Sequence, residues 1–468
     1  MPSLDPALAP IFPRTSGVTP DGHLAIGGCD AVELAREFGT PLYVFDEEEL
    51  RSTCRAYREA FASLYAQSAV VYAAKAYLGR WLAALVAEEG LGMDVVSGGE
   101  LAVARAAGFP MERVLFHGNN KSAQELREAV EAGVGRIVID NFHDLELLDG
   151  IASEGGRPLP VLVRVSPGVD PHTHAKTTTG TVDVKFGFTL GRSWLPREAA
   201  AGEGAPDTSK GQSNGGGRAE EAVVQTMANP HLELLGLHCH LGSPIFELEP
   251  YWQANDVMIG FAREMRDRHG LELRELNIGG GFAAQYLRDK PAPAIEQYAQ
   301  AVVESLRESL TKHELPEPML FVEPGRAIVA RAGVALYTVG ARKEIPGVRT
   351  YVSVDGGMGD NIRPAMYDAR YEALVANRVT EPPAERVTIA GKYCESGDVL
   401  IKDIELPVLR AGDVLALPAS GAYCLPMASN YNLSPRPPVV LLRDGHARLV
   451  CRRETYEDLM RTEMLGEE

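Results

Sequence analysis

The chain has 468 residues, 45% of them hydrophobic and 24% charged, a composition typical of a globular protein with two or three domains. Its 46 basic and 64 acidic residues give a net charge of −18 with histidine neutral, which argues against nucleic acid or an anionic membrane surface as a partner. No segment approaches the ~20 consecutive apolar residues that a membrane-spanning helix needs.

The N-terminus and the cysteines bear on where the protein works. The N-terminal sequence MPSLDPALAPIFPRTSG has no basic stretch followed by an apolar one, so we expect no secretion signal. The six cysteines are scattered along the chain without a CxxC pair, which indicates neither a disulfide framework nor a zinc site. We therefore expect a cytoplasmic protein that binds no membrane.

Between Ser68 and Glu323, short β-branched runs alternate with stretches of helical periodicity. Strands that alternate with helices form parallel βαβ units, and eight such strands are the number in a (β/α)8 barrel; a doubly wound sheet is the alternative. The expected strands are residues 68–74, 92–96, 114–118, 136–140, 160–166, 234–240, 275–279 and 319–323, and the expected helices include residues 99–107, 123–132, 250–269 and 294–313.

The first of these strands ends at a lysine, Lys75, in the sequence VYAAKAY. An unpaired ammonium is costly to bury, so this lysine either reaches water or is used chemically, for instance to form a Schiff base. The other strands also end in polar residues or glycine, and in a barrel these ends converge on the mouth where active sites lie. They are Asp94, His117, Asn119, His240, Gly279–Gly281 and Glu323.

Two glycine-containing loops complete this mouth. LNIGGGF (276–282) follows the seventh strand and EPGRAIV (323–329) follows the eighth, where barrels of this kind bind phosphate. Each loop alone could be only a tight turn, and neither matches the dinucleotide pattern GxGxxG. Both loops together, facing a lysine at a strand end, point to pyridoxal 5'-phosphate (PLP) as the ligand.

The remaining segments have other compositions. Residues 199–219 are rich in Gly, Ser, Ala and charged residues and are predicted to be a flexible insertion. Residues 40–45 (TPLYVF) form an apolar run that is expected to pair into a C-terminal all-β domain. The expected domains are an N-terminal segment (1–45) that contributes to the β domain, the barrel (46–326) and the β domain itself (327–468), of sandwich or barrel type, with strands near 334–340, 350–354, 386–392, 412–417 and 438–442.

From about Pro41 to Leu459 the chain resembles the PLP-dependent group IV decarboxylases of alanine-racemase-like fold, and within them the diaminopimelate decarboxylases. The resemblance is carried by ten motifs in the family's order. They are YAAKAY (72–77), GMDVVSGGEL (92–101), KFGF (185–188), GLHCHLGS (236–243), LNIGGGF, EPGR, RPAMYDA (363–369), CESGD (394–398), GAYC (421–424) and RRETYEDL (452–459).

The resemblance implies a role for several of the residues at the barrel mouth. Lys75 matches the lysine that holds PLP, and Glu323 matches the carboxylate that keeps the pyridine nitrogen protonated. Related racemases place an arginine at the position of Glu323, so the carboxylate favours a decarboxylase. Asp94 would be a supporting carboxylate. The other implied cofactor or substrate residues are His240, stacked on the ring, Tyr423, and the phosphate or substrate contacts Ser243, Gly280, Gly281, Gly325 and Arg326.

The β domain supplies the remaining implied residues. Cys394 matches the family's proton donor and Glu395 the residue that binds the distal ammonium of the substrate. Arg326 and Arg363, with Tyr367, would hold the distal carboxylate, which diaminopimelate has and ornithine lacks. The family also implies a homodimer with shared active sites, in which Cys394 and Glu395 serve the barrel of the partner chain.

Three further features are less specific. His238 and His240 form a His-x-His pair, but no third ligand is evident, so we expect no metal. His172, His174 and the threonines 177–179 are expected to form a polar, mobile lid. Three other functions remain alternatives. A related PLP decarboxylase could act on ornithine, lysine or carboxynorspermidine. A non-catalytic regulator is possible in principle, although such regulators lose the residue at Lys75 or at Cys394, and a flavin-dependent oxidoreductase barrel is the third.

Overall fold

The computed structural model describes residues 3–171, 173–174, 176–191, 194 and 217–464. The chain forms two compact units. The barrel unit consists of Cys54–Ala283 and Pro293–Gly325, and the β unit consists of Met1–Thr53, Ala284–Ala292 and Arg326–Glu468. Most of the predicted insertion at 199–219 lies outside the described residues.

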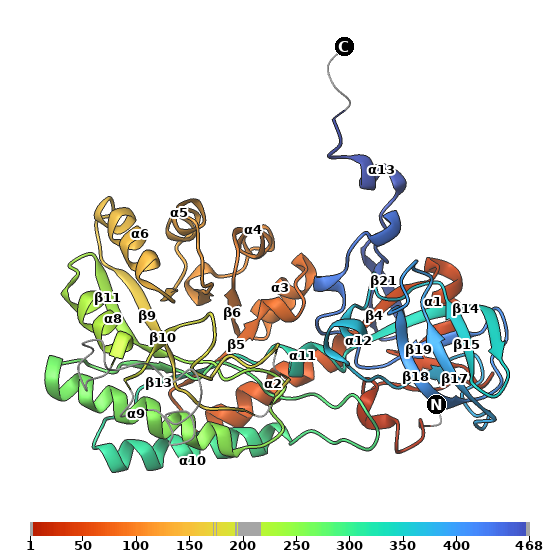
Figure 1. The fold of residues 1–468 in the computed structure, drawn as a ribbon, viewed down its shortest axis with the longest axis horizontal. Helices are drawn as coiled ribbons and strands as arrows, with labels where there is room; N and C mark the ends of the chain where they lie inside the picture. Colours follow the sequence, from red (N-terminus) through yellow and green to blue (C-terminus); the bar gives the residue numbers. More distant parts are fainter. Residues whose placement is uncertain (1–2, 172, 175, 192–193, 195–216, 465–468) are drawn as a thin grey trace. The chain divides into compact units, whose positions relative to one another are not determined.

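The barrel unit is built on eight parallel strands that close into a ring. Figure 1 shows helices on opposite sides of these strands. The order around the ring is β9-β11-β12-β13-β5-β6-β7-β8, and the pairing of β8 with β9 closes it. The closed ring confirms the (β/α)8 barrel and excludes the doubly wound alternative. The strands are β5 (Ser68–Ala73), β6 (Gly92–Val95), β7 (Val114–Phe116), β8 (Arg136–Ile139), β9 (Leu159–Ser166), β11 (Leu232–His238), β12 (Glu275–Asn277) and β13 (Met319–Val322), with a short β10 (Phe188–Thr189) beside β9.

Large apolar side chains fill the ring, and an ion pair lies at its N-terminal end. Arg136, the first residue of β8, donates two hydrogen bonds to Glu275, the first residue of β12, at 2.9 and 2.6 Å. This end of the barrel is therefore sealed by structural contacts, and the opposite end is free for chemistry. The interior cluster consists of Val71, Leu115, Val138, Leu162 and Phe321, one residue from each of five strands.

The helices of the barrel unit follow the sequence signals for their ends. Before α5, Ser122 and Glu125 form a reciprocal capping box, and Gly133 ends the helix in a left-handed conformation. No helix in the described part of the chain is long and apolar enough to cross a membrane. The helices are α2 (Glu47–Leu64), which begins in the β unit, α3 (Arg80–Glu88), α4 (Gly98–Ala106), α5 (Ala123–Ala132), α6 (Phe142–Ser153), α8 (Gly217–Ala228), α9 (Glu249–His269) and α10 (Ile295–His313).

The β unit contains one large mixed sheet. Its order is β18-β17-β15-β14-β4-β20-β21, with β19 also paired to β14 and β16 paired to β19. Strand β4 lies between β14 and β20, so residues 42–46 pair into this unit. The strands are β4 (Leu42–Asp46), β14 (Gly333–Ile345), β15 (Arg349–Val354), β16 (Leu374–Val375), β17 (Glu385–Ala390), β18 (Val399–Leu406), β19 (Val414–Leu417), β20 (Val439–Arg443) and β21 (His446–Cys451).

The N-terminal residues pack into the same unit. They form a three-stranded sheet followed by a helix, and apolar residues such as Phe12 and Ile26 join the core formed by Val44, Leu336 and Leu442. These elements are β1 (Gly17–Val18), β2 (Leu24–Ile26), β3 (Cys29–Asp30) and α1 (Ala31–Phe38), and the other helices of the unit are α11 (Arg326–Val329), α12 (Arg363–Tyr367) and α13 (Tyr456–Met460).

Candidate active site

Lys75 lies just past the end of β5, in a short 3-10 turn formed by Ala74–Ala76. Its two neighbours are buried, but the lysine side chain is exposed. The amine is therefore not enclosed in the strand that the apolar run suggested. It is available to react at the C-terminal end of the barrel strands, where the sequence analysis placed it.

Asp94, on the neighbouring strand β6, is an almost fully buried carboxyl group. It is 2% exposed, and its Oδ1 has no hydrogen-bond partner among the described residues. Burial raises its pKa, the charge of Glu323 raises it further, and Lys75 only partly offsets both, so the pKa lies well above its ordinary value. Asp94 therefore binds a proton more readily than an ordinary carboxylate.

Glu323, directly after β13, is held by side chains from three other strands. Asn277 Nδ2 donates to its Oε1 at 2.8 Å, His238 Nε2 lies 3.4 Å from its Oε2, and His117 Nε2 lies 2.9 Å from Oε1. Burial alone would raise the pKa of Glu323, but the two histidines outweigh burial and hold it well below its ordinary value. Glu323 is therefore the ionised carboxylate of the site and Asp94 the protonation-prone one.

The same histidines offer a possible metal-binding group. The ligand atoms of His117, His238 and Glu323 all lie within 4.8 Å of one another. His240, the second histidine of the His-x-His pair, is not part of this trio. Burial lowers the pKa of His238 to about 3, so its ring is a neutral hydrogen-bond donor to Glu323. The absence of a metal remains a prediction.

His240 is fixed against the glycine loop that follows β12. The Gly280 N–H donates to its Nδ1 at 3.1 Å, so the proton of the neutral ring belongs on Nε2. Burial, followed by the positive charges of Lys75 and Arg164, holds the pKa of His240 well below its ordinary value. The carbonyl of His240 accepts a hydrogen bond from the Thr179 hydroxyl at 2.9 Å. The ring is therefore neutral and held in one tautomer.

The glycines of LNIGGGF are required by close packing of the chain on itself. A Cβ atom at Gly280 would lie 2.1 Å from the carbonyl oxygen of Glu323, and one at Gly281 would lie 2.5 Å from that of Gly242. Gly281 also has a φ of 100°, a backbone conformation that other residues rarely adopt. From the sequence these glycines were expected either to let a ligand approach or to form a tight turn, and close packing against Glu323 and Gly242 is a further reason for them.

An aromatic cluster supports the glycine loop from within the barrel unit. Phe282 stacks on Tyr251 with ring centroids 5.6 Å apart, and Tyr298 meets it edge-on at 5.1 Å. The Tyr251 hydroxyl donates to the carbonyl of Gly280 at 3.1 Å. Neither tyrosine was expected from the sequence, because nothing in their helices marks them as contacts of a loop that is distant in sequence.

Ser243 and Gly325 are the other predicted phosphate contacts in the barrel unit. Ser243 follows β11 and is partly buried, and Gly325 packs so tightly on β5 that a Cβ would lie 2.8 Å from that of Ala73. In the predicted lid, Thr178 forms an isolated β-bridge with Gly242, so this part of the lid is held against the segment that follows β11. His174 is exposed, and His172 lies outside the described residues.

In the β unit, Arg363 is the most informative of the predicted residues. It begins α12, is 7% exposed, and donates a hydrogen bond to the Tyr371 hydroxyl. Its guanidinium lies 4.7 Å from the centroid of the Tyr286 ring. Among the described residues no carboxylate pairs with it. Neither Tyr371 nor Tyr286 was expected from the sequence.

Arg326 shares Tyr286 with Arg363. Its Nη1 donates to the Tyr286 hydroxyl at 3.0 Å, and its guanidinium lies 4.6 Å from the centroid of the Tyr423 ring. Tyr423 has a φ of 61°, which is strained for an aromatic residue and is typical of functional positions. Arg326 and Arg363 therefore contact the same tyrosine, Tyr286. Tyr367 is the last residue of α12, and its hydroxyl lies 4.0 Å from the sulfur of Met427.

Cys394 and Glu395 lie on an exposed loop of the β unit, and both side chains are exposed. The Cys394 N–H donates to Asn432 Oδ1 at 3.0 Å. The loop is fixed by Asp398, whose carboxylate accepts from the N–H groups of Tyr393 at 2.8 Å and Met358 at 2.7 Å. Asp398 is therefore a structural residue of the CESGD motif, a role that the sequence analysis did not assign. All six cysteines are free, and all lie in the described part of the chain.

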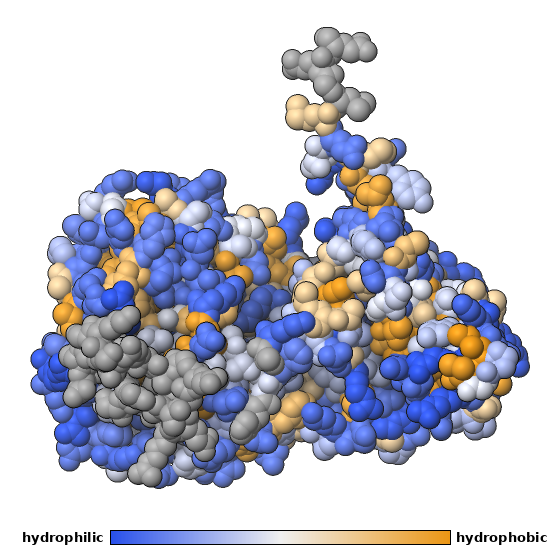
Figure 2. All heavy atoms as spheres, in the orientation of Figure 1, coloured by the Kyte–Doolittle hydropathy of each residue, from blue (hydrophilic) through white to orange (hydrophobic). Residues whose placement is uncertain are grey.

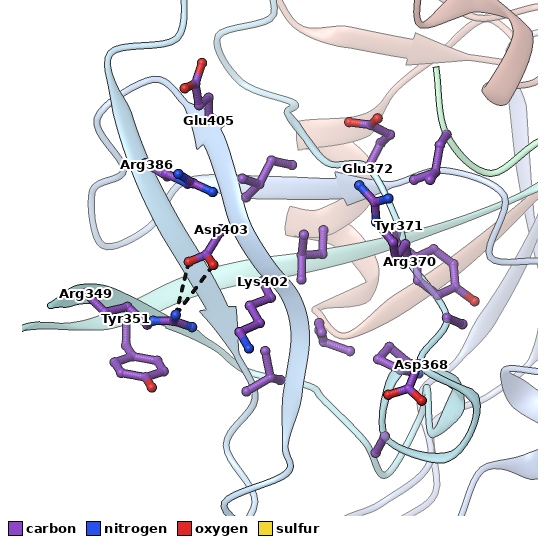
Figure 3. Close-up of a pocket in the computed structure, with 18 of the residues that line it drawn as sticks. Arg349, Tyr351, Asp368, Arg370, Tyr371, Glu372, Arg386, Lys402, Asp403 and Glu405 are labelled. Carbon is purple, nitrogen blue, oxygen red and sulfur yellow. Dashed lines mark hydrogen bonds and ion pairs between the residues drawn. The ribbon is translucent and has the colours of Figure 1, made fainter. Parts of the chain in front are cut away.

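A hollow of about 1040 Å³ lies on the β unit, against β18, α12 and Tyr371 (Figure 3). Its floor is apolar, with Leu400 and Ile401 buried. Its rim carries charges of both signs, and Arg349 pairs with Asp403 at 3.5 Å. Because cations and carboxylates alternate around it, the hollow does not favour a ligand of one charge, and we assign it no function.

Comparison with known proteins identifies the family. Residues 47–203 and 208–330 match the family described as "Pyridoxal-dependent decarboxylase, pyridoxal binding domain". A diaminopimelate decarboxylase of Bacillus subtilis (strain 168) is 45% identical over 96% of this chain and 97% of its own length, and one of Halalkalibacterium halodurans is 45% identical over 97% and 98%.

A crystal structure agrees with these matches. Diaminopimelate decarboxylase from M. jannaschii in complex with L-lysine superposes with a TM-score of 0.86 at 34% identity, covering 97% of this chain and 98% of the other. The aligned residues cover nearly the whole chain, so the similarity extends beyond the PLP-binding barrel. The chain therefore belongs to the pyridoxal-dependent decarboxylases and, within them, to the diaminopimelate decarboxylases.

Proposed function

We propose that this protein decarboxylates meso-2,6-diaminopimelate to L-lysine and CO2, the last step of lysine biosynthesis. The observation that carries the choice of substrate is Arg363, a buried guanidinium that pairs with no carboxylate in the described chain. A buried charge without a counter-ion is costly unless a ligand supplies one. The distal carboxylate of diaminopimelate is such a counter-ion, and ornithine and lysine have no distal carboxylate.

PLP is the cofactor, and the groups at the barrel mouth fit it. When bound, PLP stabilises the negative charge left on the substrate carbon after CO2 departs. Lys75 supplies an exposed amine for covalent attachment, and ionised Glu323 favours a protonated ring nitrogen. His240 presents a neutral ring to the cofactor. The proposed phosphate and supporting contacts are Ser243, Gly280, Gly281, Gly325, Arg326, Tyr423 and Asp94.

The far end of the substrate would be recognised in the β unit. Arg326 and Arg363 are planar forks that can each bind a carboxylate through two N–H groups. Tyr286 keeps them oriented, because its hydroxyl accepts from Arg326 while Arg363 lies over its ring. Tyr367 adds a hydroxyl and Glu395 a negative charge for the distal ammonium. Cys394 delivers a proton to the carbon that has lost CO2.

We further propose that the protein is a cytoplasmic homodimer with shared active sites. Cys394 and Glu395 are exposed within one chain, and their loop is bound to a segment with exposed apolar side chains, including Leu433, which is 70% exposed. Figure 2 shows a largely hydrophilic face on which apolar residues are also exposed along the C-terminal segment, where Met460 is 54% exposed. A second copy covering this surface would bring Cys394 to the barrel of its partner.

A substrate panel tests the proposal. We expect CO2 release from meso-diaminopimelate by the wild type, and much slower or no release from ornithine, lysine or carboxynorspermidine. Arg363→Lys keeps the charge but loses the fork, so it should slow turnover of diaminopimelate far more than it weakens PLP binding. Arg342→Lys is the matched control, since Arg342 pairs with Glu385 on the surface of the same unit. Equal turnover of ornithine, or unchanged kinetics of Arg363→Lys, would contradict the choice of substrate.

A further inference from the structure

Asn277 is a buried side chain that joins two separate parts of the barrel mouth. It is the last residue of β12 and is fully buried. Its Nδ2 donates to Glu323 Oε1 at 2.8 Å, and its Oδ1 accepts from the Gly279 N–H at 2.9 Å. One amide therefore binds both the carboxylate after β13 and the first glycine of the loop after β12.

The two partners fix the orientation of this amide. The Gly279 N–H can only donate, so the oxygen of Asn277 faces the glycine and the NH2 group faces Glu323. A second link runs in the opposite direction, because the Glu323 N–H donates to the Gly279 carbonyl at 2.8 Å. Gly279 is thus held at both its N–H and its C=O, and Glu323 at both its side chain and its backbone.

We infer that Asn277 is a positioning residue that couples the phosphate-binding glycine loop to the carboxylate that serves the ring nitrogen of PLP. The inference rests on the proposed cofactor contacts of Glu323, Gly280 and Gly281. Asn277 sets the position of Glu323 relative to the loop, and its N–H stabilises the ionised carboxylate. Its loss affects both ends of the cofactor at once, which a residue that only supports the fold would not do.

The barrel unit offers a matched control. Asn255, on α9, is 1% exposed, and its Nδ2 donates to the Val302 carbonyl at 3.1 Å and to Ser305 Oγ at 2.7 Å. Its partners are on helix α10 and take no part in the site. Asn255→Leu and Asn277→Leu therefore each remove the hydrogen bonds of a buried amide from the same unit.

Cofactor affinity tests the phosphate end. The cofactor-free proteins are titrated with PLP and with pyridoxal, which lacks the phosphate. In Asn277→Leu we expect the Kd for PLP to rise about tenfold, and the preference for PLP over pyridoxal to shrink, as the loss of a hydrogen bond to a charged group predicts. Asn255→Leu should retain the wild-type preference. A preference unchanged by Asn277→Leu would overturn the link to the glycine loop.

The protonation of the ring nitrogen tests the other end. Proteins saturated with PLP labelled with 15N in the ring are compared by NMR, because the chemical shift of that nitrogen reports whether it carries a proton. We expect a shift towards the unprotonated value in Asn277→Leu and none in Asn255→Leu. If Asn277→Leu does not fold, Asn277→Ser, which shortens the side chain, replaces it. A wild-type shift in a folded Asn277 variant would overturn the inference.

The same samples separate this inference from the proposed function. If wild-type protein bound no PLP or released no CO2 from diaminopimelate, the proposed function would fail. If the wild type did both while Asn277→Leu matched Asn255→Leu in both measurements, only the inference about Asn277 would fail. A further outcome would also overturn the inference. If Co2+ bound to His117, His238 and Glu323 of the cofactor-free wild type so tightly that PLP no longer bound, the cluster would be a metal site instead.

Discussion

Arg363 donates a hydrogen bond to the hydroxyl of Tyr371, and both side chains are buried in the β unit. The Tyr371 hydroxyl also lies 3.4 Å from the sulfur of buried Cys424, so it is fixed on its far side. A phenol can orient a guanidinium but cannot neutralise it. The pair therefore presents a fixed cation whose counter-ion must come from a ligand.

Tyr371→Phe keeps the ring that packs against Tyr286 and removes only the hydroxyl. Without that hydrogen bond Arg363 can rotate away from its binding position, so we expect the KM for diaminopimelate to rise about tenfold, with a smaller change in kcat. Steady-state kinetics provide the measurement. Tyr65→Phe is the control: its buried hydroxyl donates to the Pro318 carbonyl at 2.7 Å, and its loss should lower stability but leave KM unchanged.

Reduction with borohydride should attach the cofactor to Lys75. Lys75 is exposed at the barrel mouth, whereas Lys121 is 2% exposed and donates to the Asp144 carboxylate at 2.7 Å and to two carbonyl groups. We expect peptide mapping by mass spectrometry to find the pyridoxyl group on Lys75. A label on Lys121 or on Lys185, which is also exposed, would show that the site has been assigned to the wrong lysine.

Asp360 gives the β unit a pH-dependent stability. Burial raises its pKa from about 3.8 to about 6, although Tyr337, Gly357 and Tyr43 donate hydrogen bonds to it. A carboxyl whose pKa is raised on folding stabilises the native state at low pH, and this stabilisation is lost between about pH 3.8 and pH 6.

The variant Asp360→Asn cannot lose a proton. Between pH 4 and pH 7 we therefore expect its free energy of unfolding to improve relative to wild type by about 2 kcal/mol, most of the ~3 kcal/mol that corresponds to the whole rise in pKa. Denaturant titrations at several pH values provide the test. Parallel pH profiles for the two proteins would mean that Asp360 titrates normally in the folded state.

The sequence was sufficient to predict the barrel, because its strands are short β-branched runs that alternate regularly with helices. It was not sufficient for β21, whose residues are largely exposed and lack the alternation of a half-buried strand. In β18 the apolar run is interrupted by Lys402 and Asp403, and Asp403 has a φ of 57° at an irregular pairing with β17. The short strands β1–β3 have too few residues to show any period.

The candidate site was predictable where a residue type is unusual for its position. A lysine is unusual directly after a buried strand, and three successive glycines are unusual after another, because each is costly unless the site uses it. The contacts that tune the site were not predictable, because they join residues far apart in sequence. Asn277 looks like an ordinary strand residue until the barrel brings it to Glu323, and His238 stood out only through its pairing with His240, not as a contact of Glu323. Tyr286 and Tyr371 likewise become partners of the arginines only in the folded β unit.

Mixed dimers test the proposal that active sites are shared between chains. Lys75→Ala and Cys394→Ala should each be nearly inactive as homodimers, because each lacks the same group at both sites. In a mixed dimer with shared sites, one site carries both changes and the other carries neither, so about half of the wild-type activity should return. The two variants are co-expressed with different tags and purified through both. No recovery in verified mixed dimers would place both residues of a site in one chain.

The reaction in D2O tests the central claim most directly, that this protein replaces a carboxyl group of diaminopimelate with a proton. The protein is incubated with meso-diaminopimelate, and CO2 is measured together with the mass and NMR spectrum of the amino-acid product. The account predicts one CO2 for each L-lysine, with one solvent-derived deuterium on the carbon that has lost CO2. Deuterium exchanged into diaminopimelate without release of CO2 would instead indicate racemisation and contradict the account, as would the absence of lysine.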